Sequence, residues 1–79
     1  MARKIFLEVI ARFSADGRIT PLSFVFEDGR TFKIERVLEI RRAASLKGGG
    51  IGIRYTVQIL GAERYIYFDE NRWFAEGKN

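Results

Sequence analysis

Cysteine and histidine are both absent from the 79 residues of this sequence. Without Cys there can be no disulfide, no thiolate zinc site, no iron–sulfur cluster and no cysteine nucleophile. Without His the chain lacks the commonest metal ligand and the commonest general base of enzymes. Its serines therefore have no imidazole to activate them. We expect a protein that is not an enzyme and that carries no metal or other cofactor.

Long apolar runs are absent too. No stretch approaches the roughly 18 apolar residues that a membrane-spanning helix needs. The charged residues Glu8 and Arg12 interrupt the apolar start of the chain, and no small-residue cleavage site of a signal peptide follows. We therefore expect a cytoplasmic protein with no membrane segment.

Apolar side chains are nevertheless plentiful, since 47% of the residues are hydrophobic and 14% are aromatic. A domain of this length buries only about 60% of the surface that its unfolded chain exposes, so it needs a rich core. The length fits one domain and not two. We expect residues 1–79 to form a single domain around one core.

Alternation of apolar and polar residues predicts β-strands along most of the chain. Asp28-Gly29 lies between two alternating runs, which predicts a hairpin with a two-residue turn and positive φ at both central residues. The fold class is therefore mainly β, and we expect a small six-stranded antiparallel barrel of the SH3-like type. The six predicted strands cover residues 4–13, 22–27, 31–42, 51–59, 64–68 and 72–76.

The third of these strands has an alternative. Ile34, Val37, Leu38 and Ala44 also fit the stripe of an amphipathic helix, and a short helix around 35–46 would favour an OB-like barrel. We favour the strand because the alternation of the preceding hairpin continues without a capping break. Twelve residues is long for a strand, so a bend or bulge near Arg36-Val37 is expected.

A glycine-rich segment, residues 47–52, follows the third predicted strand. Consecutive backbone amides in such a segment could cradle a phosphate. It lacks the Gly-Lys-Ser/Thr ending of a P-loop and the glycine spacing of a dinucleotide-binding fingerprint. The composition is more typical of a plain connection, here between the two halves of the sheet.

Basic residues outnumber acidic residues by 14 to 10, and ten of the basic residues are Arg, which mildly favours an anionic partner. If Ile66, Phe68 and Phe74 face the core, alternation places the other aromatic residues of the last two strands outward, beside arginines. Such rings could stack bases while the guanidinium groups contact phosphates. A chain this short also needs its aromatic residues for the core. The candidate site consists of Arg54, Arg64, Tyr65, Tyr67, Arg72 and Trp73.

These features lead to two hypotheses of different classes. The first is a non-catalytic binding module for RNA or single-stranded DNA that uses the Arg and aromatic face. The second is a protein-interaction or homodimerising module that pairs through an exposed strand edge or an aromatic patch and has no nucleic-acid ligand.

Several segments of the chain, taken together, resemble small uncharacterised bacterial proteins of about 80 residues. The resemblance covers most of the chain and implies a discrete compact domain. It implies no activity and transfers no functional residue. The segments that carry it are 21–24, 28–30, 41–46, 52–55 and 72–74.

Overall fold

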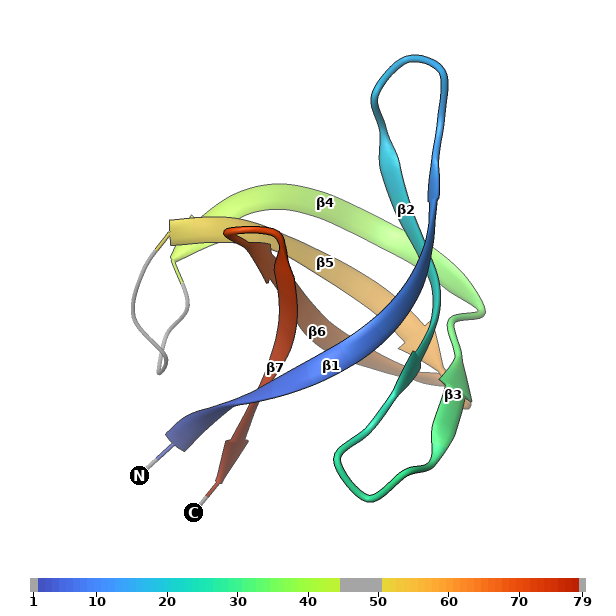
Figure 1. The fold of residues 1–79 in the computed structure, drawn as a ribbon. Helices are drawn as coiled ribbons and strands as arrows, with labels where there is room; N and C mark the ends of the chain where they lie inside the picture. Colours follow the sequence, from blue (N-terminus) through green and yellow to red (C-terminus); the bar gives the residue numbers. More distant parts are fainter. Residues whose placement is uncertain (1, 45–50, 79) are drawn as a thin grey trace.

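The computed structural model describes residues 2–44 and 51–78, and these form seven strands joined by short connections (Figure 1). The first four residues of the glycine-rich segment, 47–50, lie outside the described residues. In chain order the strands are β1 (Ala2–Phe13), β2 (Ile19–Val25), β3 (Thr31–Lys33), β4 (Arg36–Ala44), β5 (Ile51–Ile59), β6 (Ala62–Asp69) and β7 (Arg72–Lys78).

All seven strands belong to one antiparallel sheet with the order β3-β2-β1-β7-β6-β5-β4. The first and last strands are neighbours, paired from Ala2 opposite Lys78 to Leu7 opposite Trp73. Figure 1 shows that the sheet curls into a half-barrel and that the two chain ends lie side by side. The prediction of a mainly β antiparallel fold is confirmed.

The curled sheet is closed at one corner by the connection between β3 and β4. The amide of Ile34 donates to the carbonyl of Leu22 in β2, at 2.9 Å, and the next amide, of Glu35, donates to Gln58 in β5, at 2.8 Å. Successive amides of an extended chain point to opposite sides, so one dipeptide can join two strands that lie far apart in the sheet order. The hydroxyl of Tyr55 adds a second link when it donates to the carbonyl of Ile19 at 2.9 Å.

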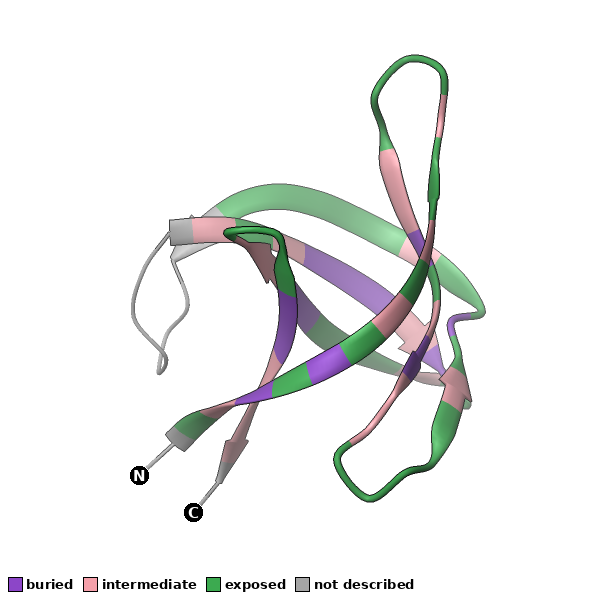
Figure 2. Cartoon of the chain, viewed as in Figure 1, coloured by how far each residue is buried: buried purple, intermediate pink, exposed green. Residues whose placement is uncertain are grey.

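The concave face of the half-barrel holds the core, and along β1 buried residues, purple in Figure 2, alternate with exposed ones. The first strand follows its predicted pattern, since Ile5 and Leu7 are buried and Val9 and Ala11 pack against them. Alternation along 4–13 predicts Phe13 on this face as well, but Phe13 is exposed because the end of β1 projects beyond the core in a hairpin. The nine core residues are Ile5, Leu7, Phe24, Ile34, Tyr55, Val57, Ile59, Ile66 and Trp73.

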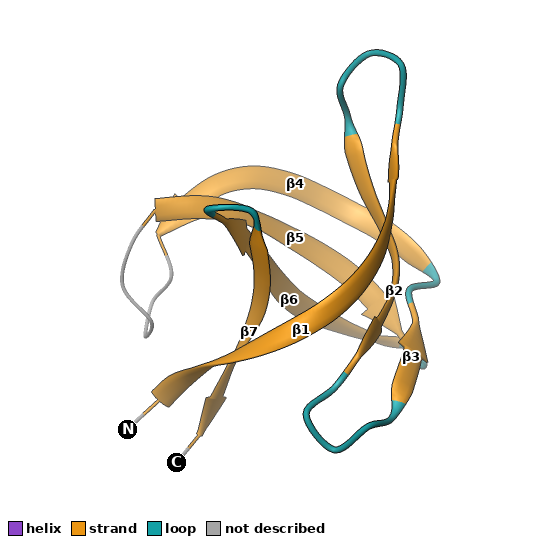
Figure 3. Ribbon diagram, viewed as in Figure 1, coloured by secondary structure: helices purple, strands orange, loops and turns teal. Residues whose placement is uncertain are grey.

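None of the described residues forms a helix (Figure 3). The alternative of a helix around 35–46 is wrong, because Arg36–Ala44 is a strand that pairs with β5. The expected irregularity is present as a register shift between Val37 and Glu39. Seven strands replace the expected six because the chain leaves the sheet pattern at Ile34 and Glu35 and divides the predicted third strand. In 2–44 and 51–78 there is accordingly no helix that could cross a membrane.

The predicted hairpin at Asp28-Gly29 is confirmed, but its loop holds three residues instead of two. Gly29 N donates to the carbonyl of Phe26 at 2.9 Å, and Phe26 N donates to the carbonyl of Arg30 at 2.8 Å. Within this loop only Gly29 has a positive φ, of 88°, so the expectation of two residues with positive φ in the turn is wrong. Its position after a tight turn matches the three-residue hairpin loop, in which Gly occupies the left-handed position.

Two-residue turns occur in the later hairpins. Leu60 and Gly61 join β5 to β6 with φ values of 52° and 78°, and Glu70 and Asn71 join β6 to β7 with 50° and 63°. Two consecutive positive φ values give the turn that matches the twist of paired strands. Leu is a poor residue for this backbone region, because its Cβ crowds the following carbonyl.

Replacing Tyr55 by Phe tests the hydrogen bond from the Tyr55 hydroxyl in β5 to the Ile19 carbonyl in β2. We expect the free energy of unfolding to fall by about 1–2 kcal/mol, because the Ile19 carbonyl loses its donor. Urea denaturation measures this change, with Tyr65→Phe as a control on a half-exposed ring. Equal losses in the two variants would show that the Tyr55 hydroxyl has no special role.

Replacing Leu60 by Asn tests the strain in the turn between β5 and β6. Leu60 is 80% exposed, so the substitution removes little packing. Because Asn tolerates the left-handed region better than Leu does, we expect the free energy of unfolding to rise by about 0.5–1 kcal/mol. Leu60→Ala keeps the strain and serves as the control. An Asn variant no more stable than the Ala variant would contradict the idea.

Candidate nucleic-acid interface

A row of five side chains crosses the convex face of the sheet. Each residue stands opposite the next one on a neighbouring strand, from β1 through β7, β6 and β5 to β4. Residues that are directly opposite share one face of a sheet. This face is convex because the neighbours of these residues along each strand, such as Leu7, Trp73 and Ile66, belong to the core. The convex row consists of Phe6, Phe74, Tyr67, Arg54 and Arg41.

The middle of the convex row is covered by its own neighbours. The rings of Tyr67 and Phe74 stack with centroids 5.1 Å apart, and they are only 1% and 2% exposed. The Lys4 ammonium lies 4.6 Å from the centroid of Phe74. The Tyr67 hydroxyl donates to a carboxylate oxygen of Glu76 at 3.2 Å. These two rings stabilise the convex face and present no surface to a ligand.

Two exposed aromatic rings flank this covered centre, and each carries an arginine. Phe6 is 46% exposed, and the guanidinium of Arg72 lies 3.6 Å from its centroid. Tyr65 is 49% exposed, and the guanidinium of Arg54 lies 4.4 Å from its centroid. Each pair joins a flat π surface to a cation within the range of a cation–π interaction.

Arginines on neighbouring strands share one carboxylate beside Tyr65. Arg41 and Arg54 stand directly opposite each other, and their guanidinium nitrogens lie 3.9 and 4.0 Å from the oxygens of Glu39. Both distances are too long for hydrogen bonds. Nε of Arg54 is buried and has no hydrogen-bond partner among the described residues. The group carries a net positive charge and unused donors, which suits an anion with several acceptor oxygens.

The structure brings four of the six predicted site residues onto the convex face: Arg54, Tyr65, Tyr67 and Arg72. Tyr65 is exposed as predicted. Tyr67 points away from the core, as predicted, but is buried under its neighbours.

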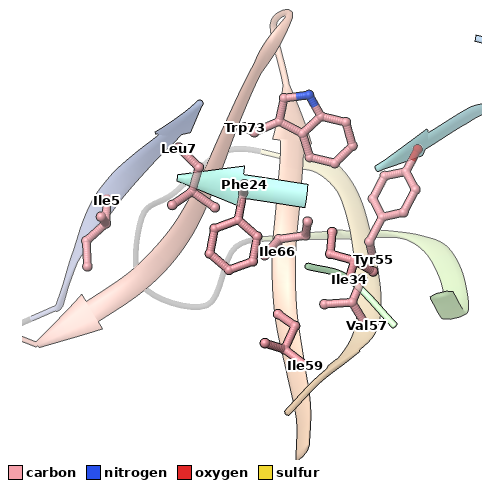
Figure 4. Close-up of a cluster of buried hydrophobic side chains, with 9 residues drawn as sticks. All are labelled: Ile5, Leu7, Phe24, Ile34, Tyr55, Val57, Ile59, Ile66 and Trp73. Atoms are coloured by element: carbon pink, nitrogen blue, oxygen red, sulfur yellow. The ribbon is translucent and has the colours of Figure 1, made fainter. Parts of the chain in front are cut away.

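The expected outward position of Trp73 is wrong. Its ring lies in the core between Tyr55 and Phe68, at centroid distances of 5.0 and 4.8 Å (Figure 4 shows Trp73 above Tyr55). Phe74, expected inward, belongs to the convex row. The sequence carries a signal for this arrangement, because Phe74 alternates in step with the charged residues Arg72 and Glu76. Charged side chains keep to the solvent side of a sheet, and Trp73 must then face inward.

Arg64, the sixth predicted residue, lies on the other side of β6 from Tyr65. It reaches a split in the sheet, because β6 and β7 pair only from Tyr67 opposite Phe74 to Asp69 opposite Arg72. The split holds a cavity of about 370 Å³. Arg64 and Tyr65 therefore meet at one opening although they start on different faces. The cavity is lined by Phe24, Phe26, Phe32, Ile59, Ile66 and Ala75, with Arg64, Tyr65, Tyr67 and Glu76 around them.

Phe6 and Arg41 lie in the convex row but are not among the predicted site residues. Alternation along the first strand already placed Phe6 on the face opposite the core. Its position beside Arg72 and Phe74 depends on the pairing of the first strand with the last, for which the local pattern contains no signal.

No family model matches the chain, and no curated protein or solved structure is significantly similar to it. The resemblance to small bacterial proteins stays a prediction.

The buried phenol of Tyr67 predicts a pH dependence of stability. Burial raises the pKa of Tyr67 above its usual value of 10.0, the charge and hydrogen bond of Glu76 raise it further, and Arg54 lowers it. A raised pKa favours the neutral phenol in the folded state. The contribution of the neutral Tyr67 phenol to the free energy of unfolding is therefore complete below pH 10, and it is lost as the pH rises through the folded-state pKa.

The variant Tyr67→Phe removes that ionisation. We expect its free energy of unfolding to fall less steeply than that of the wild type as the pH rises above about 10. Urea denaturation at a series of alkaline pH values measures the slope, and tyrosinate absorbance should show one late-titrating phenol fewer. An unchanged slope would mean that Tyr67 ionises as freely in the folded protein as in the unfolded chain.

Proposed function

We propose that this protein is a non-catalytic module that binds single-stranded RNA or DNA on its convex face. The observation that carries the proposal is the pair of exposed rings, Phe6 and Tyr65, each beneath an arginine on the convex face of the sheet. Arg54 and Arg41 beside Tyr65, Arg72 beside Phe6, and Lys4 over Phe74 add positive charge where a phosphate backbone would pass. Exposed aromatic rings and a basic track are the two elements of sequence-tolerant single-strand binding.

In this proposal a base displaces the arginine from the ring of Phe6 or Tyr65 and stacks there, while the arginine turns to a phosphate. Each stacked base contributes about 1–3 kcal/mol to binding. Arg41, Arg54 and Arg72 contact the phosphates. A single strand fits better than a duplex, because only unpaired bases can turn their flat faces onto protein rings. The apolar cavity beside Tyr65 is large enough to admit a base from the same strand.

We also propose that the half-barrel is a variant of the SH3-like barrels. Its strongly bent antiparallel strands and its closure at Ile34 and Glu35 support this comparison. Small barrels of several kinds bind single strands through their sheet faces, so the comparison agrees with the proposed ligand without establishing it.

Fluorescence anisotropy of labelled 12-nucleotide RNA and DNA strands tests the proposed function. We expect binding of both single strands, weaker binding of a duplex, and weakening as salt rises. Tyr65→Ala and Phe6→Ala should each weaken binding about tenfold, because each removes a stacked base. Phe13→Ala, which removes an exposed ring from the projecting hairpin, should leave the affinity unchanged.

The salt dependence tests the phosphate contacts separately. Arg41→Gln should lower the slope of log Kd against log salt by about 0.7, the value for one lost phosphate contact on a single strand. Arg18→Gln on the projecting hairpin is the matched control and should keep the slope. Absence of binding even at low salt, or equal losses in the variants and their controls, would overturn the proposal.

A further inference from the structure

The free edge of β4 is the longest unpaired edge at the margins of the sheet. Among the described residues, β4 (Arg36–Ala44) is the last strand in the sheet order and pairs only with β5, where every residue except Leu38 has a partner. The opposite margin is β3, with three residues. The backbone amides and carbonyls that point away from β5 can pair with another strand, as at any open sheet edge.

Apolar side chains lie exposed along this edge. Leu38 and Ile40 in β4, together with Ile53 in β5, are all exposed. They line an open groove between β4 and the start of β2, where Ile19 and Thr20 form the opposite wall. This patch is continuous with the free backbone edge. A strand that pairs with β4 would cover part of it.

We propose that the partner of this edge is a second copy of the chain, paired antiparallel through β4 around a two-fold axis at Ile40. In an antiparallel pair, the residue numbers of two directly opposite residues always add up to the same value, and this sum defines the register. Directly opposite residues also lie on the same face of the sheet. From Leu38 to Arg42, successive side chains alternate between the two faces of the sheet. Two opposite residues then share a face only if their numbers are both odd or both even, so the sum must be even. A sum of 80 places Ile40 opposite its own copy, and it places Glu39 of each chain opposite Arg41 of the other.

The neighbouring registers are unfavourable. A sum of 78 would place Glu39 opposite Glu39, and a sum of 82 would place Arg41 opposite Arg41. Like charges directly opposite each other destabilise a strand pair, whereas opposite charges stabilise it. The register centred on Ile40 therefore combines two ion pairs on the convex face with an apolar pair on the concave face.

This self-complementary pattern is the reason to assign the edge to a second copy instead of an unrelated peptide. When the order Glu39, Ile40, Arg41 is paired antiparallel with a second copy of itself, each Glu lies opposite an Arg. In the monomer, Glu39 and Arg41 are only loosely paired, at 3.9 Å. The dimer joins the two convex faces into one surface. Its formation requires no nucleic acid and does not depend on the proposed function.

Cysteine cross-linking tests the register directly, because the chain has no native Cys. Opposite Cα atoms in an antiparallel pair lie about 4.5–5.5 Å apart, within the range that a disulfide spans. We expect Ile40→Cys to form a covalent dimer under mild oxidation. Leu38→Cys should not, because residue 38 would face Arg42 of the other chain. Leu60→Cys is a control for random collision at a fully exposed turn.

A charge exchange tests the same register in solution without nucleic acid. Sedimentation velocity should give a dimer dissociation constant about tenfold higher for Glu39→Arg and for Arg41→Glu, since each creates like-charged pairs across the interface. The double variant E39R/R41E should restore the wild-type value. Circular dichroism checks that each variant is folded.

The proposal is overturned if Ile40→Cys cross-links no better than Leu60→Cys, or if Leu38→Cys cross-links equally well. It is also overturned if the double variant fails to recover dimerisation while folded, or if the wild type is a monomer at millimolar concentration. The cross-linking result holds even where a charge variant does not fold. Loss of dimerisation with intact binding of oligonucleotides would leave the proposed function untouched.

Discussion

The two successive amides of Ile34 and Glu35 impose the constraint on which the rest of the molecule depends. Because they donate to β2 and to β5, they bring together strands that are four places apart in the sheet order. A single antiparallel sheet without this tie would leave its apolar face open to water. With the tie, the sheet curls, and its concave face buries a core that includes Ile34 itself. The closure thus converts one layer of strands into a domain with an interior.

The same curl accounts for the surface features. On the convex side, the pairing of β1 with β7 carries the aromatic side chains of the first and last strands into one row with those of β6. Because the half-barrel is closed at a single corner, three openings stay: a groove beside β4, a free edge along that strand, and a split where β6 and β7 diverge. The candidate pairing edge and the cavity beside Tyr65 are therefore consequences of incomplete closure, whereas the candidate ligand face follows from the pairing of β1 with β7.

Much of the strand pattern was predictable, because alternation over 4–13 and 51–59 reports directly which side chains must leave water. The hairpin at Asp28-Gly29 was predictable for a similar local reason, although its loop length was not. Trp73 and Phe74 show the limit. Two adjacent large aromatic residues give no preference for either face, and the decision came from Arg72 and Glu76, which must keep their charges in solvent. The division of 31–42 into two strands follows from the distant partners of Ile34 and Glu35, which no local pattern indicates.

The sequence by itself determined the class of the protein: a chain without His or Cys, rich in β-branched and aromatic residues, and punctuated by turns, that folds as antiparallel strands. Tertiary structure alone decided which strands became neighbours. The contact of Phe6 with Arg72 and Phe74, the opposition of Arg54 and Arg41, and the exposure of the β4 edge all follow from the sheet order. The physical reason is that alternation specifies the face on which a side chain lies, whereas its neighbours across the sheet depend on pairing between segments far apart in the chain.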